Sequence, residues 1–221
     1  MQWQGAIFDM DGTLVDSLGV WNVLWEAIGK KYFGREHYRP EESVDAAVRT
    51  MIFTEAIPYI LKACSIPTTG EELLKALEGE VLAFYRDRVQ LKPDMRELLE
   101  HLRQKNVRLC IASATQPELI RLTLRRCGID GYFQAVISCC DVGCGKNRPD
   151  VYQKALETLG TPPAEAAVFE DSYVALETAA SLGVYTVGIY DPYNYHQDRL
   201  RKASRQYIAP GETVGRLIPL L

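Results

Sequence analysis

The stretch Gly-Ala-Ile-Phe-Asp-Met-Asp-Gly-Thr-Leu-Val-Asp-Ser, residues 5–17, carries the strongest structural signal in this chain of 221 residues. Its apolar residues 6–8 form a run that is too short for a helix and predict a buried strand. Asp9 and Asp11 follow where that strand should end, and the next two residues, Gly12 and Thr13, predict a turn. Because residues i and i+2 of a strand project to the same face, we expect both carboxylates to reach one small volume.

Two neighbouring carboxylates have a limited chemistry. They repel each other unless a cation or a shared proton lies between them. Oxygen ligands suit a hard divalent ion such as Mg²⁺, which also takes substrate phosphate into its coordination shell. One carboxylate can attack phosphorus to give an aspartyl-phosphate while the second transfers protons. The alternative is a loop of surface acids next to a helix, but the position directly after the first strand favours the chemical interpretation.

The composition is that of an ordinary globular protein, with 47% apolar and 24% charged residues. A net charge of −4 argues against general nucleic-acid binding. The residues before position 5 show no basic region with a long apolar stretch after it, and no run approaches the length of a membrane span. We therefore expect a soluble, cytoplasmic protein, either a monomer or a weak homodimer, that binds neither nucleic acid nor a membrane.

Three of the six cysteines, Cys139, Cys140 and Cys144, form the one group that resembles part of a zinc site. The group has no second well-spaced pair and no nearby histidine to complete four ligands. We interpret the cysteines as free thiols that pack in a reducing compartment.

The segment 17–89 is predicted to be all-helical. Apolar residues within 18–31 are spaced by three and four, which indicates an amphipathic helix with Asp16 or Ser17 as its N-cap. Helical patterns continue through residues 41–64 and 70–89. No strand signal interrupts them.

From residue 93 onward, helical stretches alternate with compact apolar runs at 108–112, 135–138, 166–169 and 184–189. This alternation predicts an α/β fold, a Rossmann-like core with a parallel sheet covered by helices on both faces. We expect residues 1–16 and 90–221 to form the catalytic core and residues 17–89 to form a helical cap inserted after the first strand. Because open α/β sheets bind ligands beyond the carboxyl ends of their strands, the cap should cover the site.

Three later stretches place polar groups at the same edge of the predicted sheet. The strand at 108–112 leads to Ser113, and Pro117 can open the next helix. The Ser113 hydroxyl and the amides beyond it could hold phosphate oxygens, although Ser113 could equally be an N-cap. Lys146 begins a loop before the helix at 151–159 and offers a compact cation for a carboxylate or a phosphate.

The last of these stretches, Val-Phe-Glu-Asp-Ser at 168–172, ends a strand in the acidic pair Glu170 and Asp171. These acids could join a metal site or could simply favour the N-terminus of the helix at 172–182.

Four stretches of the chain resemble, in order, the four signatures of the haloacid dehalogenase-like hydrolase superfamily. They are Asp-Met-Asp-Gly-Thr-Leu-Val-Asp-Ser, the strand ending in Ser113, Gly-Lys-x-x-Pro-Asp-x-Tyr and the Glu-Asp pair. The resemblance covers residues 5–191, is weakest in the helical insertion, and is closest to the branch with a helical cap that includes β-phosphoglucomutase. Two departures are Asn147, where many relatives have proline, and Val174-Ala175, near a common glycine.

The resemblance implies Mg²⁺-dependent phosphoryl transfer in which Asp9 attacks phosphorus and Asp11 acts as acid and base. Lys146, Ser113 and the amides near Gly12 and Ala114 would hold the phosphoryl oxygens. The metal would be held by Asp9, the backbone carbonyl of Asp11, and Asp171, with Glu170 as a ligand directly or through water. Dehalogenation is disfavoured because Asp11 is retained.

We expect a phosphatase for a small phosphorylated metabolite. A sugar phosphomutase is the first alternative and needs a second phosphate anchor in the cap. Residues 18–88 carry nine Lys/Arg and eleven Asp/Glu, a balance of 9 − 11 = −2. The cations that could still form such an anchor are Lys30, Lys31, Arg35, His37, Arg39, Arg49, Arg86 and Arg88. Each is most simply a solvated side chain. The second alternative is a non-catalytic protein that keeps the fold. The presence of Asp9, Asp11, Lys146 and Asp171 disfavours this alternative.

Overall fold

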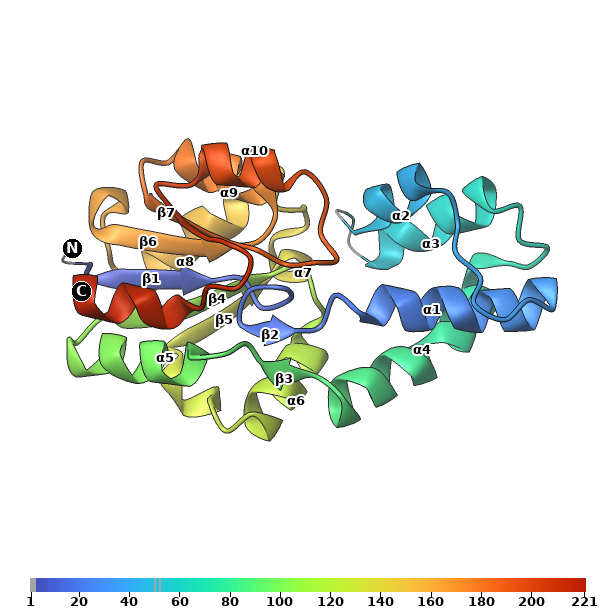
Figure 1. The fold of residues 1–221 in the computed structure, drawn as a ribbon, viewed down its shortest axis with the longest axis horizontal. Helices are drawn as coiled ribbons and strands as arrows, with labels where there is room; N and C mark the ends of the chain where they lie inside the picture. The colour runs from blue at the N-terminus through green and yellow to red at the C-terminus, as the bar shows by residue number, and fades with distance from the viewer. Residues whose placement is uncertain (1–2, 50, 52) are drawn as a thin grey trace.

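The computed structural model describes residues 3–49, 51 and 53–221, and its centre is a six-stranded parallel sheet (Figure 1). The strand order is β5-β4-β1-β6-β7-β8. The strands are β1 Gly5–Phe8, β4 Arg108–Ser113, β5 Ala135–Ser138, β6 Ala166–Glu170, β7 Tyr185–Ile189 and β8 Gln206–Ile208. All five neighbouring pairs are parallel, so the predicted α/β class is confirmed.

Strand β1 lies between β4 and β6. Phe8 at the end of β1 lies opposite Ile111 in β4 and Phe169 in β6. The carboxyl ends of these three strands therefore lie at the same edge of the sheet. Strand β8 was not predicted.

Helices cover both faces of this sheet, as the alternation of side chains along β1 requires. Ile7 belongs to the core on one face, while Ala6 and Phe8 belong to the core on the other. Helices α8 Asp150–Leu159, α9 Tyr173–Ala180 and α10 Gln197–Ala203 cover the Ile7 side. Helices α5 Met95–Gln104 and α6 Pro117–Arg126 and the 3₁₀ helix η4 Val214–Leu220 cover the Phe8 side. Three short elements connect them: η2 Asp130–Tyr132, α7 Cys139–Val142 and η3 Pro163–Glu165.

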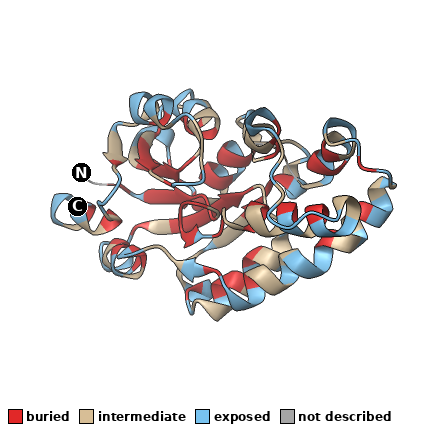
Figure 2. Cartoon of the chain, turned by 45° about the vertical axis from the view of Figure 1, so that its right-hand side comes forward, coloured by how far each residue is buried: buried red, intermediate tan, exposed pale blue. Residues whose placement is uncertain are grey.

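A helical segment, defined here as α1 to α4, lies beyond the carboxyl edge of the sheet (Figure 1). It consists of α1 Val20–Ile28, its π-helical continuation η1 Gly29–Phe33, α2 Glu42–Val48, α3 Phe53–Ala63 and α4 Gly70–Asp87. Figure 2 shows that buried residues lie in the sheet and on the inward faces of these helices. The division into a core and a cap at residues 17 and 89 stays a prediction.

The predicted N-cap of the first helix is wrong. Gly19 precedes α1, and no side chain caps it. The Ser17 hydroxyl instead donates a hydrogen bond to Asp11, six residues earlier, at 2.6 Å. A local sequence pattern could not reveal this competition, because the partner is a residue of the site.

The chain passes between the sheet and the helical segment through two short strands that pair with each other. Strand β2, Val15–Asp16, is antiparallel to β3, Gln90–Leu91. The two chain connections between the sheet and the helical segment therefore lie side by side. In the described part of the chain, no helix combines the length and the apolar character needed to cross a bilayer.

Candidate active site

A cavity of about 690 Å³ separates the carboxyl edge of the sheet from the helical segment. Asp9, Lys146 and Asp171 line it from the sheet side, and Trp21 and Tyr85 line it from the helices. The cavity therefore lies where ligands bind in open α/β sheets.

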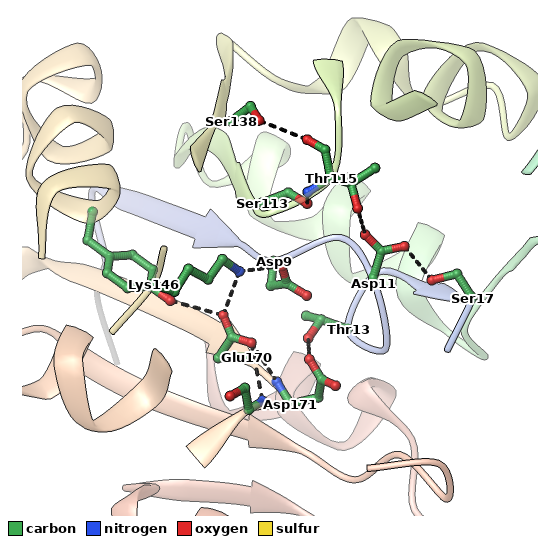
Figure 3. A network of polar contacts seen from close by, with 12 residues as sticks. Asp9, Asp11, Thr13, Ser17, Ser113, Thr115, Ser138, Lys146, Glu170 and Asp171 are labelled. Atoms are coloured by element: carbon green, nitrogen blue, oxygen red, sulfur yellow. Dashed lines mark hydrogen bonds and ion pairs between the residues drawn. The ribbon is translucent and has the colours of Figure 1, made fainter. Parts of the chain in front are cut away.

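Asp9 and Lys146 meet at the base of this cavity (Figure 3). The Lys146 ammonium donates to Asp9 Oδ1 and, at 2.8 Å, to Glu170 Oε2. No described side chain donates a hydrogen bond to the second carboxylate oxygen of Asp9. One oxygen of Asp9 is thus held by a cation while the other stays available for chemistry.

Glu170 positions the lysine. Its Oε2 also accepts a hydrogen bond from the Tyr152 hydroxyl at 3.0 Å, and its Oε1 accepts from the backbone amides of Asp171 and Ser172 at 3.2 Å each. Both carboxylate oxygens of Glu170 therefore accept hydrogen bonds. These bonds fix the position of the carboxylate that accepts from Lys146.

Burial and mutual repulsion shape the electrostatics of the acids. Burial, together with the neighbouring charge of Glu170, raises the pKa of Asp9 well above its usual value. Burial raises the pKa of Asp171 as well, with contributions from Asp9 and Glu170. For Lys146, burial acts to lower the pKa, but the charges of Asp9 and Glu170 outweigh it and raise the pKa well above the usual value. The lysine is a permanent cation in an otherwise acidic site.

Asp171 is held from two sides. The Thr13 hydroxyl donates to Asp171 Oδ1 at 3.2 Å, and the Asn194 amide donates to Oδ2 at 2.8 Å. Gly12, with φ of +77°, lies so close that a Cβ there would come within 2.3 Å of Asp171 Oδ2. Only glycine satisfies both the backbone conformation and the space at this position.

Asp9, Glu170 and Asp171 fit a divalent cation. All three side chains are buried, and each offers an oxygen within 4.8 Å of the other two. Three carboxylates facing one lysine leave an excess of negative charge, which adds to the effect of burial in raising the pKa values of Asp9 and Asp171. A hard cation with oxygen ligands would relieve it.

The Asp11 carboxylate is outside this triad and is directed toward three hydroxyl groups. Its Oδ1 accepts from Ser17 and from Tyr85, and its Oδ2 accepts from Thr115, each at 2.6 Å. Asp11 and Asp9 line the same cavity, but they have separate partners. The predicted contribution of the Asp11 carbonyl to a metal site stays a prediction.

The predicted phosphate-binding residues differ in whether they line the cavity. Ser113 is fully buried, and its hydroxyl oxygen accepts from the Thr115 amide at 3.1 Å. Ala114 and Thr115 line the cavity, whereas Ser113 and Gly12 are not part of its lining. Phosphate binding by Ser113, Ala114 and Gly12 stays a prediction.

Four residues of the site escaped the sequence analysis: Tyr85, Thr115, Tyr152 and Asn194. Thr115 adjoins the predicted phosphate loop, and Tyr152 belongs to the Gly-Lys-x-x-Pro-Asp-x-Tyr stretch, so the sequence held a signal for both. Tyr85 occupies an inward position of α4, and Asn194 lies in the loop after β7. Their roles depend on tertiary packing and left no local pattern.

Among the basic residues considered for a second phosphate anchor, Arg49 lines the cavity. Its guanidinium forms two hydrogen bonds with Asp45, at 2.9 and 3.2 Å, and donates to the Leu18 carbonyl at 3.1 Å. The other basic residues of that set are not part of the cavity lining.

Comparison with known proteins identifies the family. Residues 3–183 match the haloacid dehalogenase-like hydrolase family. The match spans most of the chain, and the chain belongs to this family of enzymes.

Relatives within the family carry the names of phosphatases and of a mutase. The chain is 26% identical over 219 residues to a phosphorylated carbohydrates phosphatase of Thermotoga maritima, covering 99% of this chain and 100% of that protein. It is 26% identical over 199 residues to the β-phosphoglucomutase of Bacillus subtilis, covering 84% and 83% of the two chains. The crystal structure of CbbY from Rhodobacter sphaeroides, in complex with phosphate, shares the fold with a TM-score of 0.79 at 21% identity over 93% of each chain.

Proposed function

We propose that this protein is a Mg²⁺-dependent phosphatase that hydrolyses a small phosphorylated metabolite through an aspartyl-phosphate on Asp9. The observation that carries the proposal is that the two aspartates have different hydrogen-bond partners. Asp9 has one oxygen on Lys146 and faces the cavity with the other, while three hydroxyls hold Asp11 nearby.

In the first step, the Asp9 carboxylate attacks phosphorus, an oxygen–phosphorus bond forms, and the ester oxygen–phosphorus bond breaks. Asp11 gives its proton to the departing alkoxide. Lys146 and the backbone amides after β4 stabilise the charge on the phosphoryl oxygens. In the second step, Asp11 takes a proton from water as the water attacks phosphorus, which releases phosphate and restores Asp9.

Asp9, Asp171 and the Asp11 carbonyl would hold the metal ion, with Glu170 contributing directly or through water. Once bound, the ion neutralises charge on the transferring phosphoryl group. Glu170 keeps Lys146 in contact with Asp9, and Thr13 and Asn194 fix the orientation of Asp171.

The helical segment acts as a cap in this proposal. Tyr85 reaches from α4 to Asp11, so the segment supplies part of the support for the proton-transfer residue. The phosphatase name of the Thermotoga maritima relative supports the same activity, and the phosphate complex of CbbY is consistent with a phosphate site in this fold.

The direct test is Asp9→Asn, assayed for phosphate release from a panel of phosphorylated sugars, nucleotides and small acids with and without Mg²⁺. We expect no turnover by the variant and an unchanged circular-dichroism spectrum. Asp198→Asn, an exposed change on α10, is the control and should behave as the wild type. Near-normal phosphate release by Asp9→Asn would refute the assignment of the nucleophile.

The β-phosphoglucomutase of Bacillus subtilis is a reason to test the mutase alternative. The paired state of Arg49 favours a phosphatase, since a bisphosphate needs a cation for its second group. A coupled assay on hexose 1-phosphates, with and without catalytic hexose 1,6-bisphosphate, separates the two. Formation of hexose 6-phosphate faster than phosphate release would establish a mutase and leave the role of Asp9 intact.

A further inference from the structure

Large hydrophobic side chains form part of the cavity lining, called here the apolar wall. Side chains from α1, α3, α4 and α6 form it, and the largest are Trp21, Leu24, Phe53, Val81, Leu82 and Leu119. Leu82 is 47% exposed, one of three large hydrophobic side chains that stand out in this way in the described part of the chain. Its exposed surface faces the cavity and is available for contact with a ligand.

The charges around this apolar wall are mostly negative and have no partners. Glu55 on α3, Glu78 on α4 and Glu118 on α6 line the cavity and are exposed. None of them takes part in an ion pair with another described residue. They stand on three different helices, so the cavity faces acidic groups from several directions.

The two cations of the described cavity lining are already engaged. Lys146 is held between Asp9 and Glu170 at the reactive end. The Arg49 side chain is only 3% exposed and forms a bidentate pair with Asp45. A second anionic group on a substrate would therefore meet unpaired carboxylates and a guanidinium whose charge is already balanced.

We propose that the substrate is a phosphate monoester whose alcohol part carries an apolar group and is uncharged or cationic. A carboxylate or a second phosphate on the alcohol part is rejected by Glu55, Glu78 and Glu118. This inference rests on the proposed phosphatase function and adds the class of substrate.

Four synthetic monoesters with similar leaving alcohols test it: methyl, benzyl, 4-carboxybenzyl and 4-(aminomethyl)benzyl phosphate. Burial of a phenyl group against the apolar wall should raise kcat/KM for the benzyl ester about tenfold over the methyl ester. The 4-carboxy group should lower kcat/KM about fivefold relative to benzyl, and added salt should reduce that penalty, because exposed charges are screened. The aminomethyl ester should be at least as good as the benzyl ester.

Two matched variants assign the effects to the cavity. Glu78→Lys should reduce the penalty for the 4-carboxy ester, whereas Glu80→Lys should not. Glu80 stands on the same helix, is also exposed and is not part of the cavity lining, and its variant has the same change in net charge. Leu82→Ala should reduce the benzyl-to-methyl ratio, and thermal unfolding should confirm that each variant is folded.

Binding of the same esters to Asp9→Asn, measured by calorimetry with Mg²⁺ present, separates the substrate class from the catalytic function. Turnover with a preference for 4-carboxybenzyl or for methyl phosphate would overturn the substrate class alone. The predicted order in binding without any turnover by the wild type would overturn the phosphatase and uphold the substrate class. Equal binding of all four esters without turnover would overturn both.

Discussion

At the scale of single residues, Asp11 is the point where three parts of the chain meet. Ser17 approaches it from the start of the helical segment, Thr115 from the loop after β4, and Tyr85 from α4. Both carboxyl oxygens of Asp11 accept from these hydroxyls, which fixes the orientation of the side chain. Burial raises the pKa of Tyr85 well above its usual value, with a further contribution from Asp11, so the phenol keeps its proton and remains a donor.

Tyr85→Phe should therefore damage the chemistry more than the fold. Loss of one donor to a charged group should lower kcat about tenfold and leave KM nearly unchanged. Steady-state kinetics on the best substrate of the panel would measure the effect. Tyr59→Phe on α3 is the control, since Tyr59 is not part of the cavity lining. A kcat equal to that of the wild type would show that the Tyr85 hydroxyl does not support Asp11 in turnover.

At the scale of elements, Asp45 in α2 joins the helical segment to the sheet. Its carboxylate accepts from Trp25 of α1 at 2.6 Å, from Arg49, and from the Tyr195 hydroxyl at 2.9 Å. Tyr195 lies in the loop after β7 and thus belongs to the part of the chain that contains the parallel sheet. The Tyr195–Asp45 bond is a direct polar link across the two sides of the cavity.

Removing this link should loosen the helical segment without touching the reactive residues. In Tyr195→Phe, we expect a KM that is several-fold higher, because the cavity wall is held less firmly, and a kcat close to that of the wild type. Amide hydrogen exchange should become faster in α2 while the sheet is unaffected. Unchanged exchange in α2 would mean that packing alone holds the segment.

The same carboxylate makes this contact sensitive to acid. Burial raises the pKa of Asp45, but the hydrogen bonds from Arg49 and Trp25 outweigh burial, so the folded-state pKa lies below the ordinary value of 3.8. A carboxyl with a lowered pKa stabilises the fold above the unfolded-state pKa, and that contribution disappears as the pH falls through the folded-state pKa.

Asp45→Asn should accordingly lower the free energy of unfolding at pH 7 by about 1 kcal/mol, after allowance for solvent screening. The difference from the wild type should shrink as the pH falls from the ordinary pKa of 3.8 through the lowered folded-state pKa of Asp45. Urea unfolding followed by tryptophan fluorescence at pH 7 and pH 3 would measure both values. A difference that is equal at both pH values would contradict the assignment.

At the scale of the whole molecule, the sequence predicted the sheet and the acids that lie at its carboxyl edge, because both depend on local patterns. A buried apolar run that ends in Asp9 or Glu170 is visible without a structure. Strand β8 escaped because Gln206–Ile208 is only three residues long and contains a single fully buried side chain. Tyr85, Asn194 and the contact between Tyr195 and Asp45 escaped because these contacts join residues that are far apart in the sequence.

The acidic triad leads to a prediction for the stability of the molecule. A ligand that binds only the folded state raises the free energy of unfolding by about 1.4 kcal/mol at ten times its Kd. Mg²⁺ should therefore raise the thermal midpoint of the wild type, and Asp171→Asn should abolish most of the increase. Asp198→Asn should retain it. An equal shift in all three proteins would point to general salt effects and away from a site at Asp9, Glu170 and Asp171.

The pairing of β2 with β3 also bears on how such a protein can be remodelled. Since the chain departs and returns through adjacent strands, Asp16 and Gln90, which flank the helical segment, are about one strand spacing, roughly 4.8 Å, apart. A foreign unit with equally close ends could be grafted at Asp16 and Gln90 without altering the sheet. Of the three hydroxyls on Asp11, such a graft would have to restore the two that Ser17 and Tyr85 supply. Recombination at this junction could change the choice of substrate while the reactive acids are inherited intact.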